Sequence, residues 1–162
     1  MTAHNYRLRV IWTGNTGDGT INRRGYRRDT VADVGEKPAL LGSSDPAFLG
    51  DPTRWNPEEL MLASLSQCHL LWYLDLAARA GVVVTDYVDE PVATMIEERD
   101  GAGQFIRATL RPTVTITDDN ARAAAMSAHS DAHAMCFIAR SVNFPVECEP
   151  TIDVVEARAT AR

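Results

Sequence analysis

The sequence predicts an α+β fold, and three features of the chain support this. A long helix pattern begins at Asn56 and ends at Gly81. Two runs of β-favouring residues, 82–98 and 104–117, follow it and are separated by the turn sequence Asp-Gly-Ala-Gly. An alanine-rich helix pattern comes next. This element order, without an internal repeat, indicates a single domain over residues 1–162.

The N-terminal third predicts two strands followed by a long loop. Apolar residues alternate over 5–13, which favours a strand, and the glycine-rich turn at 14–19 should lead into a second strand. Residues 35–55 contain three prolines and three glycines and little periodicity. We expect an ordered loop or a ragged edge strand there, and loops of this length are usually functional.

The long helix has clear start and stop signals. Asn56 is a good N-cap, Pro57 suits the first helical position, and Glu59 completes a capping box. Gly81 provides the stop, so the helix should span about 24 residues, or about 36 Å. Most of its faces are apolar, which predicts burial on several sides. A single subunit of 162 residues can hardly cover all the apolar surface of this helix, so we expect a homodimer.

The last third predicts a second helix and a final strand. Asp118 or Asp119 should cap the helix, which should reach about Ser141 with a break near Ser130. The final strand is expected over 146–155.

Composition and charge exclude several classes of function. The net charge of −6 argues against binding to nucleic acid. Residues 1–9 lack the apolar core of a signal peptide. The longest apolar stretch, residues 60–80, is interrupted by six polar residues and does not resemble a membrane span. We therefore expect a soluble, cytoplasmic protein without a membrane partner.

The chain has three cysteines, Cys68, Cys136 and Cys148, which suggests redox chemistry, metal binding or plain burial rather than a disulfide framework. Cys68 lies about three turns into the long helix, where a small core residue is the simplest interpretation. Burial would also raise the pKa of its thiol. A catalytic Cys68 therefore needs a cation beside it and a group that orients the cation.

Glu58 can supply the orienting carboxylate. It precedes Cys68 by ten residues, so the two side chains differ by about 80° around the helix axis and share a broad face. Arg54, just before the helix, and Arg28 are the candidate cations. The alternative is that Glu58 only complements the helix N-terminus and that both arginines are solvated surface residues.

Two motifs resemble the OsmC/Ohr family, the osmotically inducible and organic hydroperoxide resistance proteins. The segment 56–60, followed by Ala63 and by Cys68 ten residues after Glu58, resembles the peroxidatic helix of that family. The segment 132–136, which ends in Cys136, is similar to its resolving-cysteine segment. The family resemblance implies an OsmC-like fold, in which an antiparallel sheet wraps around a long buried central helix in an intertwined homodimer.

The resemblance also implies roles for individual residues. Cys68 corresponds to the peroxidatic thiol, Cys136 to the resolving thiol and Glu58 to the carboxylate that positions an arginine. The arginine itself has no clean counterpart: residues 42–48 contain none, and Asp18 stands where the organic hydroperoxide members carry theirs. Arg54 and Arg28 are the candidate replacements. Many members also have proline where this chain has Phe137, which indicates a divergent subfamily.

The chemistry implied by the resemblance is the reduction of an organic hydroperoxide to an alcohol. A Cys68 sulfenic acid forms and condenses with Cys136 to a disulfide, which an external dithiol reopens. In the family this reductant is often a lipoyl-bearing protein. No cofactor and no metal are expected.

Two other functions remain open on the sequence. His129, His133 and Cys136 stand at i, i+4 and i+7, a spacing that suits zinc ligands on one helical face. A dimeric module that binds an apolar small molecule, with merely buried cysteines, is the second alternative. Cys148 has no evident partner along the chain, and we interpret it as structural.

Overall fold

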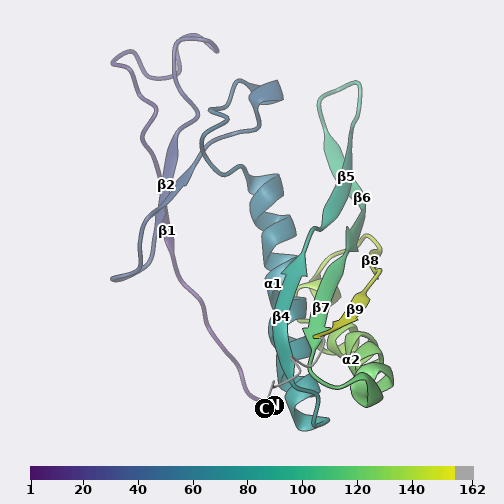
Figure 1. The fold of residues 1–162 in the computed structure, drawn as a ribbon. Coiled ribbons are helices and arrows are strands. Elements are labelled where there is room, and N and C mark those ends of the chain that lie inside the picture. The colour runs from purple at the N-terminus through teal and green to yellow at the C-terminus, as the bar shows by residue number, and fades with distance from the viewer. Residues whose placement is uncertain (156–162) are drawn as a thin grey trace, which may run out of the picture. The chain divides into compact units, whose positions relative to one another are not determined.

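The computed structural model describes residues 1–155, so residues 156–162, the end of the predicted single domain, lie outside the described part (Figure 1). The chain divides into two compact units: an N-terminal unit, Met1–Met61, and a C-terminal unit that begins at Leu62. Each unit is described by itself. The long helix α1 begins in the first unit and continues into the second.

The N-terminal unit contains an antiparallel three-stranded sheet in the order β1-β2-β3. The strands are β1 (Arg9–Trp12), β2 (Thr30–Asp33) and β3 (Leu40–Gly42), and a single 3-10 turn, η1, covers Pro46–Phe48. The first predicted strand is confirmed. The predicted loop at 35–55 contains β3 and a bridge between Gly42 and Trp55, so it partly forms a sheet edge.

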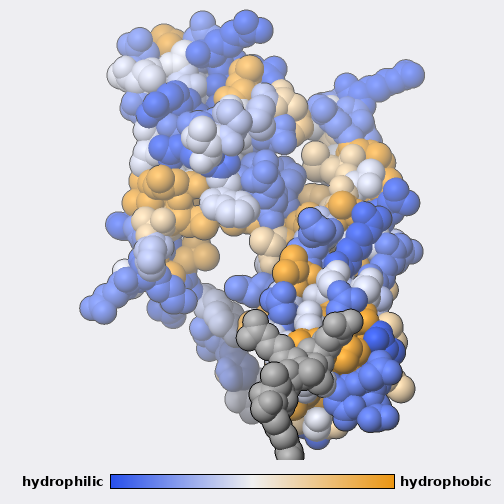
Figure 2. Space-filling view, viewed as in Figure 1, coloured by the Kyte–Doolittle hydropathy of each residue, from blue (hydrophilic) through white to orange (hydrophobic). Residues whose placement is uncertain are grey.

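This sheet exposes much of its apolar surface. All four residues of β1 are exposed, and Val10 keeps 62% of its surface accessible. Leu41 of β3 is 50% exposed. Hydrophobic side chains accordingly gather on the surface over β1 and β2 (Figure 2). A contiguous exposed apolar patch of this kind is typical of a surface that another chain covers.

Helix α1 (Pro57–Arg79) begins and ends where the sequence predicts. The Glu59 amide donates to the Asn56 side chain at 2.7 Å, and the Asn56 amide donates to the Glu59 carboxylate at 3.1 Å. This reciprocal pair is the predicted capping box. Gly81 has a φ of 75°, the left-handed conformation that ends a helix at low cost in glycine.

Only one stripe of α1 is fully buried within the chain. Its members recur every fourth residue and therefore lie on one face: Leu65, His69, Tyr73 and Ala77. Leu71, on another face, is 60% exposed, and Leu74 is 36% exposed. The predicted burial on several sides is therefore not reached within this chain.

Each of the two long strands predicted after α1 is divided in two. The four segments are β4 (Val84–Asp89), β5 (Val92–Glu97), β6 (Gly103–Leu110) and β7 (Pro112–Ile116). Pro91 and Pro112 stand at the breaks, where each lacks the amide that a continuous ladder needs. The Asp89 carboxylate accepts the Arg111 amide at 2.7 Å and so ties the two breaks together.

The divided strands form two sheets of the C-terminal unit, β4-β7-β9 and β5-β6-β8. The predicted hairpin is confirmed, because β5 and β6 pair antiparallel. The predicted final strand is also divided, at Pro150, into β8 (Val146–Cys148) and β9 (Thr151–Val154). These two run parallel to β6 and β7, so both sheets are mixed rather than wholly antiparallel as expected.

The second helix is shorter than predicted. Asp118 caps a 3-10 turn, η2 (Asp119–Ala121), and α2 covers Arg122–Met135. The helix ends at Cys136, whose backbone is extended, and a separate turn, η3, covers Ala139–Ser141. The predicted break near Ser130 is wrong, because the helix runs through that position. Cys136 therefore lies at the helix end.

The main core of the C-terminal unit lies between α1, α2 and the β4-β7-β9 sheet, with Tyr73, Val114 and Ala128 among its members. A second cluster of Leu65, Ala108 and Leu110 packs beside β6. This arrangement confirms the predicted α+β class. Within residues 1–155, no helix has the length and apolarity that a membrane span needs.

Candidate active site

Cys68 borders a surface cavity of the C-terminal unit. Its side chain is half-buried, one position before the fully buried His69. The cavity has a volume of about 360 Å³, and its other lining residues are Leu71, Trp72, Asp75, Arg79 and Phe137. A small molecule in this cavity would therefore meet the Cys68 thiol alongside aromatic and aliphatic walls.

Cys136 is the buried neighbour of Cys68. It is 1% exposed, and its sulfur accepts the Ala139 amide at 3.4 Å. Burial is the main cause that raises the pKa of the Cys136 thiol to about 11, and a hydrogen bond and charge interaction with Cys68 raise it further. The two thiols are thus close enough to interact, and Cys136 is protonated near neutral pH.

Two aromatic residues form one wall of the cavity. Trp72 and Phe137 meet edge to face, with ring centroids 5.6 Å apart and an interplanar angle of 70°. At the edge of the same cavity, Arg79 pairs with Asp75 at 2.8 Å. In the sequence, Phe137 differs from the family pattern but shows no role in the site. Its contact with Trp72, four residues after Cys68, depends on how α1 and the end of α2 pack.

Glu58, the predicted orienting carboxylate, lies in the first turn of α1. Its Oε2 atom is buried and has no hydrogen-bond partner within residues 1–155. The ion pairs of the same residues do not include Glu58 either. A buried carboxylate oxygen without a partner is costly, so this atom calls for a donor.

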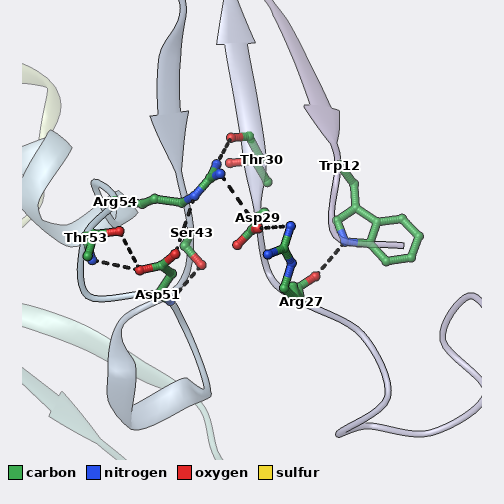
Figure 3. A network of polar contacts seen from close by, with 8 residues as sticks. All are labelled: Trp12, Arg27, Asp29, Thr30, Ser43, Asp51, Thr53 and Arg54. Atoms are coloured by element: carbon green, nitrogen blue, oxygen red, sulfur yellow. Dashed lines mark hydrogen bonds and ion pairs between the residues drawn. The ribbon is translucent and has the colours of Figure 1, made fainter. Parts of the chain in front are cut away.

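Arg54 belongs to a polar network of the N-terminal unit (Figure 3). Its guanidinium lies 3.8 Å from Asp29, which is only 2% exposed, and 3.7 Å from Asp51. It also donates to the Thr30 carbonyl at 3.5 Å. Arg27 pairs with Asp29 at 3.0 Å from the other side. All three Arg54 contacts are long.

Arg28 is held more tightly than Arg54. It donates to the Tyr26 carbonyl at 2.7 Å and to the Arg23 carbonyl at 2.5 Å. Its guanidinium carbon also lies 4.3 Å from the centre of the Tyr26 ring. Neither arginine pairs with Glu58 in the described residues, and the activating role of either one stays a prediction.

The C-terminal unit contains a second cluster of reactive side chains, which the sequence did not predict. His69 Nε2 lies 3.1 Å from His129 Nδ1 and 3.6 Å from the sulfur of Cys148. Burial lowers the pKa of both histidines to about 4 and raises the pKa of the Cys148 thiol to about 12. All three are therefore neutral at pH 7, and the view of Cys148 as a residue without a partner is wrong.

The three zinc ligands suggested by the sequence do not come together. His133 is exposed, and Cys136 lies past the end of α2 with its sulfur turned to Ala139 and Cys68. Among the described residues, the one His/Cys/carboxylate group compact enough to hold a metal is His69, His129 and Cys148. The helical spacing found only His129 of this set, because the other two residues come from α1 and β8.

The fold and the site define an α+β protein in which one cysteine borders an apolar cavity and interacts with a second, buried cysteine. Residues 50–151 match the sequence profile of the OsmC-like protein family. The chain therefore belongs to the OsmC-like proteins. No curated protein matches the chain.

Solved structures share this fold. An OsmC-like protein of unknown function from Vibrio cholerae is 27% identical, with a TM-score of 0.81 over 91% of this chain and 99% of that one. An organic hydroperoxide resistance protein from Elizabethkingia anophelis is 13% identical, with a TM-score of 0.63 over 95% of this chain and 100% of its own. The Bacillus subtilis organic hydroperoxide resistance protein OhrB is 17% identical, with a TM-score of 0.55 over 91% and 98% of the two chains. At these low identities, the last two support the fold alone.

Proposed function

We propose that this protein is a cysteine peroxidase that reduces organic hydroperoxides to alcohols. The observation that carries the proposal is the position of Cys68, which borders an apolar cavity and interacts with a second thiol, Cys136. Peroxidase chemistry needs a thiol that a peroxide can reach and a second thiol that closes a disulfide. Membership of the OsmC-like family supports the same reaction.

Cys68 attacks first, because it is the more accessible thiol of the pair. Its thiolate attacks the distal oxygen of ROOH and the O–O bond breaks. The sulfur is oxidised to a sulfenic acid, and the departing alkoxide takes a proton to become ROH. Apolar walls at Leu71, Trp72 and Phe137 favour a hydroperoxide with a hydrocarbon body over hydrogen peroxide.

Cys136 then condenses with the sulfenic acid. Its sulfur bonds to the Cys68 sulfur, the hydroxyl group leaves as water together with the thiol proton, and a disulfide results. The interaction between the two thiols supports this pairing, because a disulfide forms only between cysteines that lie close together. An external dithiol, of which a lipoyl group is one example, reduces the disulfide by exchange and is itself oxidised to a cyclic disulfide.

Glu58 positions the arginine that activates Cys68. Its buried and unpartnered Oε2 atom supports this role. Arg54 is the better of the two candidates, because its contacts at 3.5 to 3.8 Å are weaker than the 2.5 and 2.7 Å hydrogen bonds of Arg28. A guanidinium near the thiol favours the thiolate and lowers its pKa.

The working form is a homodimer. Exposed apolar side chains on two elements support it: Val10 of β1 and Leu71 of α1 are each about 60% exposed. A second copy of the chain would remove this surface from water, and dimers of the obligate kind bury more than about 2,000 Å² in total.

Thiol titration before and after one equivalent of cumene hydroperoxide tests the function. The parent should lose two thiols per chain, and the Cys148→Ser variant should lose two as well. Cys68→Ser should lose none, and Cys136→Ser should form a sulfenic acid that dimedone traps. If the parent keeps all its thiols while the hydroperoxide binds unchanged, the protein is a binding module for apolar molecules and the peroxidase proposal fails.

A further inference from the structure

Three side chains from separate elements converge inside the C-terminal unit. His69 comes from α1, His129 from α2 and Cys148 from the last position of β8. Their ligand atoms lie within 4.8 Å of one another. The peroxidase reaction described above uses none of the three. The burial of two histidines side by side therefore needs a separate explanation.

The distances between these atoms fit a tetrahedral metal centre. Zinc binds imidazole nitrogen at about 2.0–2.1 Å and thiolate sulfur at about 2.3 Å. Tetrahedral angles then place two nitrogens about 3.3 Å apart and a nitrogen about 3.6 Å from a sulfur. The observed His69–His129 nitrogen separation is 3.1 Å, and the His69 nitrogen lies 3.6 Å from the Cys148 sulfur.

The packing holds the histidine rings in position. The Tyr73 ring stacks on His129 with centroids 4.0 Å apart, and the two histidine rings are nearly parallel, at 7°. His69 is fully buried and His129 is 3% exposed. Rigid ligand side chains reduce the entropy that metal binding must overcome.

The His69 Nε2 atom faces two polar atoms, the His129 nitrogen and the Cys148 sulfur. Only one proton fits between the two nitrogens at 3.1 Å, so at most one of them donates to the other. The Cys148 sulfur then competes for the same His69 nitrogen. A cation between the three atoms would accept a lone pair from each of them.

A cavity gives solvent access to this cluster. It has a volume of about 370 Å³, and His129 and Cys148 line it together with His133, one helical turn beyond His129. The cavity borders two of the three ligands, so it gives a water molecule a route to a metal held by the two histidines and the cysteine. Three protein ligands and one open position are the usual arrangement of an accessible zinc ion.

We propose that His69 Nε2, His129 Nδ1 and Cys148 Sγ form a zinc site whose fourth ligand is water from this cavity. Two imidazoles and one thiolate suit zinc, which accepts both nitrogen and sulfur. Binding converts the Cys148 thiol into a zinc-bound thiolate, and the thiol proton passes to the solvent. The site is independent of the Cys68–Cys136 pair.

Cobalt titration tests the site, because four-coordinate cobalt(II) absorbs in the visible and a cobalt–thiolate bond absorbs in the near ultraviolet. The chain with Cys68→Ser and Cys136→Ser leaves Cys148 as its sole thiol. After treatment with a chelator, this chain should bind one cobalt per chain with both absorptions, and zinc should displace the cobalt. In weakly buffered solution, zinc should release one proton per chain and raise the melting temperature.

Substitutions in the same background identify the ligands. Cys148→Ser should abolish the thiolate absorption, and His129→Gln should weaken cobalt binding at least about tenfold. His133→Ala is the matched control and should bind cobalt as the parent does. Circular dichroism checks that each variant is folded. If a variant does not fold, the cobalt titration of the chain with Cys68→Ser and Cys136→Ser still tests the site. The proposal is overturned if the parent shows no thiolate absorption and no shift in melting temperature, if it binds copper but not zinc, or if His133→Ala loses binding as His129→Gln does.

Discussion

Cys68 and His69 are consecutive residues of α1, yet they belong to two different centres. Cys68 borders the apolar cavity and interacts with Cys136, whereas His69 is fully buried and lies 3.1 Å from His129. Successive helix residues differ by about 100° around the axis, which accounts for this separation. One helix therefore places the proposed redox thiol on one face and the proposed metal ligand on the next.

The aromatic wall should determine which peroxides react. Phe137→Ala removes the edge-to-face contact with Trp72 and part of the apolar cavity. We expect the second-order rate with cumene hydroperoxide to fall about tenfold, or 1.4 kcal/mol, because burial of the substrate's ring is lost. Stopped-flow kinetics with cumene hydroperoxide measure this rate. Hydrogen peroxide is the control, and its rate of reaction should change little. An equal fall for both would mean that Phe137 acts on the thiols rather than on the substrate.

Cys136 should show the pH dependence of a buried thiol. In the variant with Cys68→Ser and Cys148→Ser, Cys136 is the sole cysteine. Burial, the main cause of its raised pKa, is kept in this variant, so its alkylation by iodoacetamide should still rise with pH beyond about 10. An ordinary thiol, with a pKa of about 8.5, levels off there. The same chain in denaturant is the control, and identical pH profiles in the two conditions would contradict the burial of Cys136.

The raised pKa of the Cys136 thiol should make the free energy of unfolding depend on pH. Between about pH 9 and pH 11 the unfolded chain releases the Cys136 proton while the folded chain retains it. The free energy of unfolding should therefore fall as the pH rises through this window. The Cys136→Ser substitution should remove that part of the fall, as denaturant titrations at pH 8 and pH 10.5 can establish.

Glu58 and its arginine should control the reactivity of Cys68. If Arg54 is the activating cation, Arg54→Ala and Glu58→Gln should each slow peroxide reduction at least about tenfold and shift Cys68 alkylation to higher pH. Arg28→Ala should then have little effect. Arg79→Ala is the matched control, because Arg79 lines the cavity but pairs with Asp75. Parent-like rates in the Arg54, Arg28 and Glu58 variants would show that this activation scheme is wrong.

The oligomeric state provides a separate prediction. Light scattering at micromolar concentration should give twice the chain mass of 17.8 kDa. Leu71→Glu, on the exposed face of α1, should shift the protein toward the monomer, because a buried charge without a partner is costly. Val88 of β4 is 52% exposed, and Val88→Glu tests whether any added surface charge has this effect. A parent that scatters as a monomer would remove the dimer proposal.

Local sequence signals determined the boundaries of α1. Asn56, Glu59 and Gly81 act through hydrogen bonds and backbone preferences within one turn, so their effect can be read without the rest of the chain. The spacing of Glu58 and Cys68 on that helix likewise follows from helical geometry. Pro91, Pro112 and Pro150 are local signals as well. Each stands where a predicted continuous strand is divided, because proline lacks the amide that a strand ladder needs.

Tertiary structure decided which side chains meet. Cys148 lies 79 positions from His69, and His129 lies 60 positions from it, so no helix or strand period relates them. Phe137 reaches Trp72 only because α2 ends at Cys136 and turns the chain back. A hydrogen bond within a turn joins residues that are near in the sequence, whereas contacts between elements depend on how whole faces pack. The sequence by itself therefore determined the helix and its thiol motif, and the packing of α1, α2 and β8 decided the histidine–cysteine cluster.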